Sequence, residues 1–118
     1  MSDVIQFKRN SLAFEPYGDQ GAGSASIARL VGPQHSNTMG AGMARFDNVS
    51  IEWTVLYDEL IVVLEGVFRL RVGDKTFEAT PGDVLWIPEN TPRRYEGERA
   101  TVFYALAPVD WKARHALT

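Results

Sequence analysis

The chain has 118 residues, no cysteine and a formal net charge of −3 at neutral pH. This length suits one domain with one core, and 45% apolar with 23% charged residues is ordinary for a folded protein. The lack of cysteine excludes disulfides, a thiolate nucleophile and a cysteine metal site. The mild acidic balance argues against nucleic acid or a membrane as partner. The first residues do not resemble a signal peptide, so we expect a cytoplasmic protein.

Residues 1–45 differ in composition from the rest of the chain, because they are rich in Gly, Ser and Ala. One strand-like stretch, Ser26–Val31, lies among them. This part is too small to form a domain of its own. We therefore expect a single domain over residues 1–118, in which residues 1–45 form an N-terminal arm of short strands and loops that packs onto the main body.

From Phe46 onward, short runs of β-branched and aromatic residues alternate with turn signals. The expected strands are Val49–Val55, Leu60–Leu64, Val67–Val72, Val84–Ile87 and Thr101–Leu106. The expected turns are at Asp47-Asn48, Glu65-Gly66, Gly73-Asp74, Pro81-Gly82, Glu89-Asn90 and Glu96-Gly97. This spacing predicts an all-β sandwich or barrel. The run of apolar residues 60–64 should be covered on both faces, and residues 111–118 should form a short helix or a tail.

Two sequence motifs carry a resemblance to a known superfamily. The spacing of Glu59 and Gly66, followed by Pro81-Gly82 and then by Pro88, resembles the two motifs of the cupins. The resemblance covers about residues 46–108, the core of the expected domain. It implies a small jelly-roll β-barrel whose mouth usually holds a metal ion on three histidines and a glutamate.

Several further blocks occur in the same order as in the cupin domain of the EutQ (ethanolamine-utilisation protein Q) family. They are Trp53–Glu59, Val63–Gly66, Pro81–Val84 with Ile87-Pro88, and Ala107–Trp111. The sequence therefore resembles an EutQ-like cupin. The resemblance implies a link with ethanolamine and acetate metabolism, in a group connected with acetate kinase activity in bacteria that build microcompartments.

The histidines of the cupin metal site are missing from this sequence. The first two positions fall, depending on the length of the gap, on Glu52 and Thr54 or on Trp53 and Val55. The third position falls on Arg93. A protonated guanidinium repels a cation, so we expect no tightly bound transition metal. Mg2+ takes one or two carboxylates and keeps several waters, and Glu52 with Glu59 would supply that number.

Glu59 and Arg93 are the candidate catalytic pair. Glu59 precedes five apolar residues on a strand that should be buried, where a charge is costly unless it is paired. Arg93 can hold a carboxylate or phosphate with two parallel hydrogen bonds. If both side chains point into the barrel, the arginine converts a cation site into an anion site. A simple internal ion pair between the two residues is the alternative, and both interpretations stay open at this point.

Five further side chains are candidates for ligand binding, namely Tyr57, Glu52, Thr54, Tyr95 and Tyr104. Because side chains alternate along a strand, Glu52 and Thr54 share a face, which the cupin alignment places inside the barrel. For Thr54, a β-branched strand filler is the better interpretation. Tyr95 shares a face with Arg93, and Tyr57 could either contact a ligand from the rim or pack in the core with a solvated hydroxyl.

Three functions remain open from the sequence. The first is the binding of a small anionic metabolite, a carboxylate or acyl phosphate, by Arg93 and Tyr95 with Glu59 and Tyr57 opposite. The second is a metal-dependent cupin enzyme with a carboxylate-rich site, and the third is a non-catalytic, dimeric small-molecule-binding module. We expect a homodimer, because edge strands of such a barrel are usually covered and the N-terminal arm could reach a second chain. The three tryptophans, Trp53, Trp86 and Trp111, are expected in core or dimer contacts.

Overall fold

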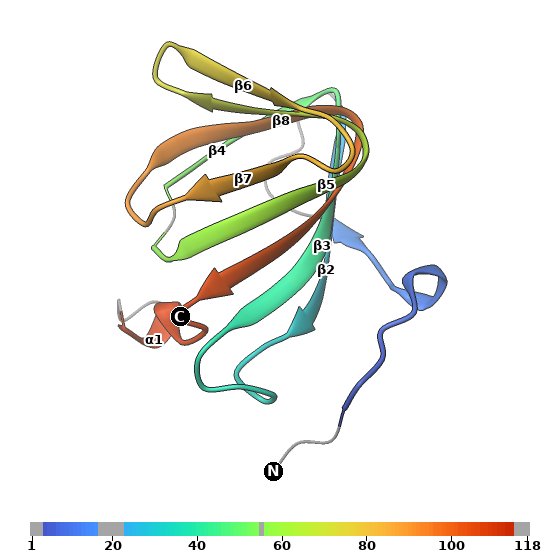
Figure 1. The fold of residues 1–118 in the computed structure, drawn as a ribbon, viewed down its shortest axis with the longest axis vertical. Helices are drawn as coiled ribbons and strands as arrows, with labels where there is room; N and C mark the ends of the chain where they lie inside the picture. The colour runs from blue at the N-terminus through green and yellow to red at the C-terminus, as the bar shows by residue number, and fades with distance from the viewer. Residues whose placement is uncertain (1–3, 17–22, 55, 115–118) are drawn as a thin grey trace.

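The computed structural model describes residues 4–16, 23–54 and 56–114 (Figure 1). Its elements are η1 (Arg9–Ser11), β1 (Glu15–Pro16), β2 (Ser24–Val31), β3 (Gly40–Asp47), β4 (Val49–Thr54), β5 (Asp58–Val72), β6 (Lys75–Ala79), β7 (Val84–Ile87), β8 (Pro92–Ala107) and α1 (Trp111–Arg114). The predominance of strands confirms the all-β prediction, and residues 111–114 are helical, which is one of the two alternatives that the sequence left open. Val55 and residues 115–118, which belonged to expected elements, lie outside the described residues. None of the described helices is long and apolar enough to cross a membrane.

The strands form one antiparallel sheet in the order β1-β2-β3-β8-β5-β6, with β4 added on β8 and β7 on β5. The long strand β8 pairs with β4 through its first half and with β3 through its second half. In the same way, β5 pairs with β7 through its first half and with β6 through its second. Figure 1 shows how these two long strands curve side by side across the molecule. The sheet therefore folds over itself into a barrel.

Two of the expected turns are bends inside long strands. The strands expected at 60–64 and 67–72 are one strand, β5, and the Glu65-Gly66 signal coincides with shifts in the register between β5 and β8. Gly66 has φ +71°, and a Cβ there would lie 2.2 Å from the carbonyl oxygen of Arg99 on β8. The Glu96-Gly97 signal likewise lies inside β8. Glu65-Gly66 therefore marks a bulge between β5 and β8, whereas Glu96-Gly97 stays in regular register with β5 and lies where β8 leaves β4 before it pairs with β3.

The other turn signals are confirmed. Gly73-Asp74, Pro81-Gly82 and Glu89-Asn90 lie between consecutive strands from β5 to β8. Asp47-Asn48 joins β3 to β4, and Asn48 has φ 54°, in the left-handed region. Both β3 and β4 pair with β8, so the chain bends here and continues along the same partner. The strand β6 was not among the expected elements.

Residues 24–47 belong to the main sheet. The expected stretch Ser26–Val31 lies within β2, and the boundary drawn at residue 46 falls inside β3, which pairs with β8 along its length. The small residues of β3 that suggested a loop have a packing role. A Cβ on Gly42 would lie 2.4 Å from the Tyr104 hydroxyl, so only glycine leaves room for that ring. Of the expected arm, residues 4–16 lie outside the barrel, with β1 at the edge of β2 (Figure 1).

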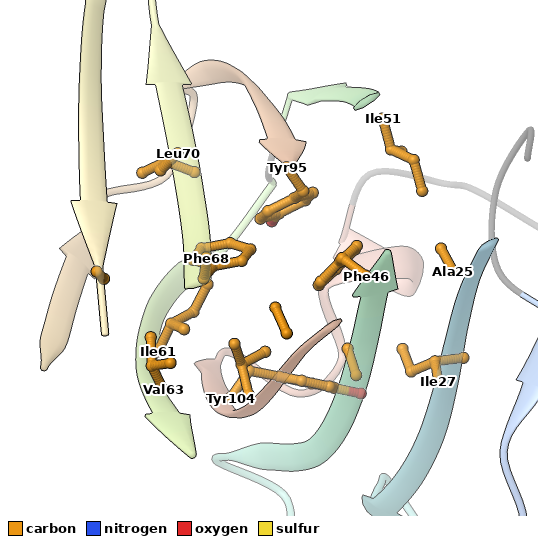
Figure 2. Close-up of a cluster of buried hydrophobic side chains, with 14 of the residues drawn as sticks. Ala25, Ile27, Phe46, Ile51, Ile61, Val63, Phe68, Leu70, Tyr95 and Tyr104 are labelled. Atoms are coloured by element: carbon orange, nitrogen blue, oxygen red, sulfur yellow. The ribbon is translucent and has the colours of Figure 1, made fainter. Parts of the chain in front are cut away.

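The hydrophobic core lies between the inner faces of the strands. Figure 2 shows Phe46, Phe68 and Tyr95 in contact at its centre, with ring centroids 5.5 to 6.0 Å apart. In β5, Ile61 and Val63 point inward and are almost completely buried. The expectation that residues 60–64 are covered on both faces is wrong within the single chain, because Leu60 on the outer face is 41% exposed.

Candidate functional site

Glu59 and Arg93 form an ion pair in the interior of the barrel. Arg93 Nη2 lies 2.8 Å from Glu59 Oε1, and the two side chains are 0% and 6% exposed, respectively. Arg93 also donates from Nη1 to the carbonyl of Thr91 at 3.0 Å and from Nη2 to the hydroxyl of Tyr95. Two charges removed from water are tolerated only when they neutralise each other in good geometry. Of the two arrangements that the sequence left open, the internal ion pair is present.

The pair joins segments that are not neighbours in the sheet. Glu59, near the start of β5, pairs in the ladder with Ile87 of β7 and Leu106 of β8. Arg93, near the start of β8, pairs instead with Trp53 of β4. The two side chains therefore meet across the interior, between the first half of β5 and the β4–β8 pair. Strand alternation in each segment turns these residues inward, but only the closure of the barrel brings them together.

Tyr95 completes a buried network of three polar side chains. Its hydroxyl donates to Glu59 Oε1 at 2.8 Å, so the same oxygen accepts from both Tyr95 and Arg93. Burial raises the pKa of Glu59, and it outweighs the opposing effects of the Arg93 charge and the two hydrogen bonds. Burial also raises the pKa of Tyr95 well above its ordinary value, with a further contribution from the negative charge of Glu59. Tyr95 is therefore a neutral donor, and the proton affinity of Glu59 is increased.

A large cavity reaches Glu59 from the solvent. Its volume is about 860 Å3, and its walls include Glu59, Tyr57, Tyr95 and Tyr104. The exposed residues of its lining come from β2 and the loop that follows it, from β4 and from α1. The cavity therefore opens on the side where these elements approach one another. Arg93 is not part of the lining, because its guanidinium lies behind Glu59 and Tyr95 in the hydrogen-bond network.

The two tyrosines outside the network also face the interior. Tyr57 is buried, and its ring centroid lies 5.1 Å from that of Trp111 on α1. Tyr104 is buried as well, and Figure 2 shows its side chain extending across the hydrophobic cluster. Its hydroxyl lies close to Gly42 of β3, where a Cβ would be 2.4 Å away. The structure thus places three of the five expected ligand-binding side chains, Tyr57, Tyr95 and Tyr104, in the wall of one cavity.

The expected inward orientation of Glu52 and Thr54 is wrong. Both side chains are exposed on β4, and Glu52 lies at the outer rim of the cavity, 76% exposed, with Oε2 3.9 Å from Arg94 Nη2. The inward face of β4 carries Val49, Ile51 and Trp53 instead. The physical reason is that this apolar set alternates with the polar set, so only one register buries hydrophobic side chains.

The residues present do not fit a cupin metal centre. The carboxylate at the glutamate position is neutralised by Arg93, and the expected Mg2+ pair is divided between the interior (Glu59) and the outer rim (Glu52). Among the residues that the structure describes, no group of three His, Cys, Asp or Glu side chains converges as metal ligands require. The donor set suits hydrogen bonding to an organic ligand better than coordination of a cation.

Comparison with known proteins agrees with this fold and with the motif residues. A family model described as "Ethanolamine utilisation protein EutQ" matches residues 15–113. The chain belongs to the EutQ family. The match begins at β1 and includes β2 and β3, so the family domain contains residues 15–45 of the expected N-terminal arm.

Curated EutQ relatives are longer than this chain. "Acetate kinase EutQ" of Salmonella typhimurium is 33% identical over 88 residues, which cover 74% of this chain and 38% of the relative. The Escherichia coli protein of the same name is 31% identical over 88 residues, with the same coverage. The chain therefore spans well under half the length of these EutQ proteins.

Solved structures show the same fold. A putative EutQ from Salmonella typhimurium has a TM-score of 0.77 and 28% identity, with 86% of this chain and 83% of that chain covered. An RmlC-like cupin from Shewanella frigidimarina has a TM-score of 0.69 at 17% identity, covering 91% of this chain and 92% of that one. These similarities confirm that the EutQ-family chain is a single cupin barrel.

Sequence reasoning did not assign Trp53 and Trp111 to the cavity of this EutQ-family barrel. Both line it, and their ring centroids lie 6.4 Å apart with the planes at 80°. Arg29 of β2 and Lys112 of α1 also lie in the exposed part of the lining. The alternation of Val49, Ile51 and Trp53 could have placed Trp53 inside. No local signal in the sequence brings α1 to the mouth of the cavity.

Proposed function

We propose that this EutQ-family cupin binds a small anionic metabolite, a carboxylate or an acyl phosphate, in the barrel cavity, in connection with ethanolamine or acetate metabolism. One observation carries the proposal: a cavity of about 860 Å3 leads from a rim with uncompensated cations to a buried, hydrogen-bonded carboxyl group. Concave sites of this size with a few convergent polar groups are typical of small-molecule binding. The family name supplies the metabolic connection.

The charges at the rim support an anionic ligand. Three cations line the exposed part of the cavity, Arg29, Arg94 and Lys112, against the carboxylates of Glu52 and Asp110. Among the described residues, Arg29 and Lys112 have no carboxylate within ion-pair distance, although the chain as a whole carries a net charge of −3. A local cationic rim on an acidic protein attracts anions toward this opening.

The interior supplies hydrogen bonds to the rest of the ligand. Both hydrogen bonds to Glu59 end on Oε1, and Oε2 accepts none from the described residues. We assign ligand contact to Glu59, Tyr57 and Tyr104, which line the cavity, and a positioning role to Arg93, which orients Glu59 from behind. The sequence predicted that Arg93 binds the anion directly. In the structure its Nη2 already donates to Glu59 and Tyr95, so we assign it no direct ligand contact.

The test is a thermal-shift and calorimetric screen of small carboxylates and acyl phosphates. A ligand at one hundred times its Kd stabilises the protein by about 2.7 kcal/mol, which gives a clear shift in Tm. The double substitution Arg29→Gln, Lys112→Gln should weaken binding, whereas Lys75→Gln on the remote β5–β6 turn should leave it unchanged. Equal affinity in the two variants, or no shift with any acid, would overturn the proposal.

The name of the curated relatives adds a specific candidate reaction, acetate kinase activity. A kinase must position nucleotide phosphates and neutralise their charge with Mg2+, so Mg2+ enters this proposal with the nucleotide. In this cavity the cations at the rim could bind the nucleotide phosphates, and Glu59 is the buried carboxyl group inside. The assay measures acetate-dependent ADP formation in the wild type and in Glu59→Gln, and an acetate-independent rate would argue against the kinase.

An uncharged surface on the outer face of the sheet supports a homodimer. Ladder pairing aligns Trp86, Leu60, Ala105 and Ala41 in one row across β7, β5, β8 and β3. A second row, two residues along each strand, aligns Val84, Val62, Phe103 and Met43. Paired residues share a face, and the intervening residues Ile61 and Tyr104 point into the core. We call these two rows the outer apolar face.

The outer apolar face fits a second copy of this chain. Leu60, Val84 and Trp86 on it are 41%, 55% and 62% exposed, and large apolar side chains that gather on one face favour an interaction surface. A two-fold contact places the same surface on both subunits, so a face without charges is complementary to itself. We therefore propose that two barrels pack through this face. The cavity opens on the side of β2 and β4, so dimer formation would leave it accessible.

A further inference from the structure

The walls of the cavity are unusually rich in aromatic rings. Six of the lining residues are aromatic, namely Phe46, Trp53, Tyr57, Tyr95, Tyr104 and Trp111. The volume of about 860 Å3 lies in the upper part of the range that accommodates drug-sized ligands. An acid with two carbon atoms would leave most of these ring faces in contact with water, and the apolar walls would contribute little to its binding.

One of these rings carries a hydrogen-bond donor without a partner. Trp53 Nε1 is inaccessible to solvent and has no acceptor among the described residues. Buried donors are normally paired, and an unpaired one costs about 1–3 kcal/mol. Trp53 lies in the cavity wall, and an oxygen atom of a bound ligand can satisfy this N–H once the indole turns toward the cavity.

A positive charge lies beside the same ring cluster. Lys112 Nζ is 5.5 Å from the centroid of the Trp111 ring, and that ring lies 6.4 Å from the ring of Trp53. Tyr57 also packs against Trp111, with the two ring centroids 5.1 Å apart. The cavity wall near Lys112 therefore combines an ammonium group, a set of aromatic faces and a buried indole N–H that has no acceptor among the described residues.

We propose that the ligand of this cavity is an aromatic carboxylic acid. Its carboxylate accepts a hydrogen bond from Trp53 Nε1 beside Lys112, and its planar ring system lies deeper, among Tyr57, Tyr104 and Phe46. The inference rests on the anionic-ligand function proposed above and names the chemical class of that ligand. An aromatic acid should bind this cavity more tightly than acetate does. The reason is that contacts between aromatic rings contribute binding free energy beyond that of the apolar area they bury.

Isothermal titration calorimetry with four acids and one alcohol tests the inference. The probes are naphthoate, benzoate, cyclohexanecarboxylate, acetate and the neutral naphthalenemethanol. We expect naphthoate to bind at least tenfold more tightly than cyclohexanecarboxylate or acetate. The Trp53→Phe variant keeps an aromatic ring but removes the donor, and a hydrogen bond to a charged group predicts a loss of tenfold or more for naphthoate.

Trp86→Phe is the matched control, because Trp86 lies on the outer face of the sheet and should leave the affinity unchanged. Circular dichroism and Tm confirm that each variant is folded. If acetate or cyclohexanecarboxylate binds as tightly as naphthoate, the aromatic class is wrong while the anionic function stands. If naphthalenemethanol binds as tightly as naphthoate, the anionic function is wrong. Equal binding of naphthoate by Trp53→Phe and the wild type overturns the role of the indole N–H.

Discussion

Arg93 and Glu59, which are 34 positions apart, share one hydrogen bond of 2.8 Å in the interior of the barrel, and the Tyr95 hydroxyl binds both. The two residues differ in whether they can become neutral when the partner is removed. An isolated Glu59 can take up a proton and become neutral, whereas arginine stays charged. This asymmetry makes the energetic role of the pair measurable.

Glu59→Met should therefore destabilise the protein more than Arg93→Met. The first variant leaves a permanent buried charge and should lower the free energy of unfolding by about 3–5 kcal/mol. The double variant Glu59→Met, Arg93→Met should lose less than the sum of the two single variants by about 1–3 kcal/mol. Urea denaturation measures all four proteins. Additive losses would show that the two residues do not stabilise each other.

The raised pKa of Glu59 predicts a defined pH dependence. The ordinary value is 4.5, and the folded value is higher because of burial, so above pH 4.5 the folded protein holds a proton that the unfolded chain has released. The stability contributed by Glu59 is complete below the unfolded pKa and is lost as the pH rises through the folded pKa. The advantage of the wild type over Glu59→Gln should therefore shrink on raising the pH from about 4 to 8.

Chemical denaturation at several pH values follows this difference. Glu89→Gln, at an exposed position, is the control for the general effect of removing one carboxyl group. A constant or growing advantage of the wild type over Glu59→Gln with rising pH would contradict the assigned direction of the shift.

Gly66 should tolerate no side chain, whereas Gly73 should tolerate alanine at moderate cost. Both have positive φ, +71° and +61°, so both alanine variants lose about 1–2 kcal/mol from backbone strain. At Gly66 the new Cβ would also collide with the Arg99 carbonyl, while Gly73 has no atom within 4 Å of that position. Thermal denaturation should show a clearly larger loss for Gly66→Ala. Equal losses would mean that the bulge between β5 and β8 adapts freely.

A charge on the outer apolar face should separate the proposed dimer. Light scattering should give twice the chain mass of 13.2 kDa for the wild type and the single mass for Trp86→Glu. Phe77→Glu is the matched control, because Phe77 is a similarly exposed aromatic residue on β6, outside the two rows. A wild-type mass near 13.2 kDa, or a dimer that survives Trp86→Glu, would contradict the proposed interface.

The fold class and the motif residues followed from local patterns. Turn residues at Gly73-Asp74, Pro81-Gly82 and Glu89-Asn90 lie where the chain reverses, because their backbone preferences act within a few residues. The spacing of Glu59 and Gly66 resembles the first cupin motif, and this resemblance predicted both the barrel and the carboxyl group in its wall. The Glu96-Gly97 signal was local too, but only packing decides whether such residues reverse a strand or bend it within a ladder.

The sequence by itself determined the all-β class, the resemblance to the EutQ family and the identity of the two charged residues that are buried in the barrel. Only the tertiary structure decided that Arg93 bonds Glu59, that Trp53 lines the cavity, and that α1 brings Lys112 to the rim. The physical reason is that side chains alternate between the two faces of every strand, but burial against the rest of the fold decides which set faces inward. Contacts across the barrel interior form only once the long strands have curved and paired.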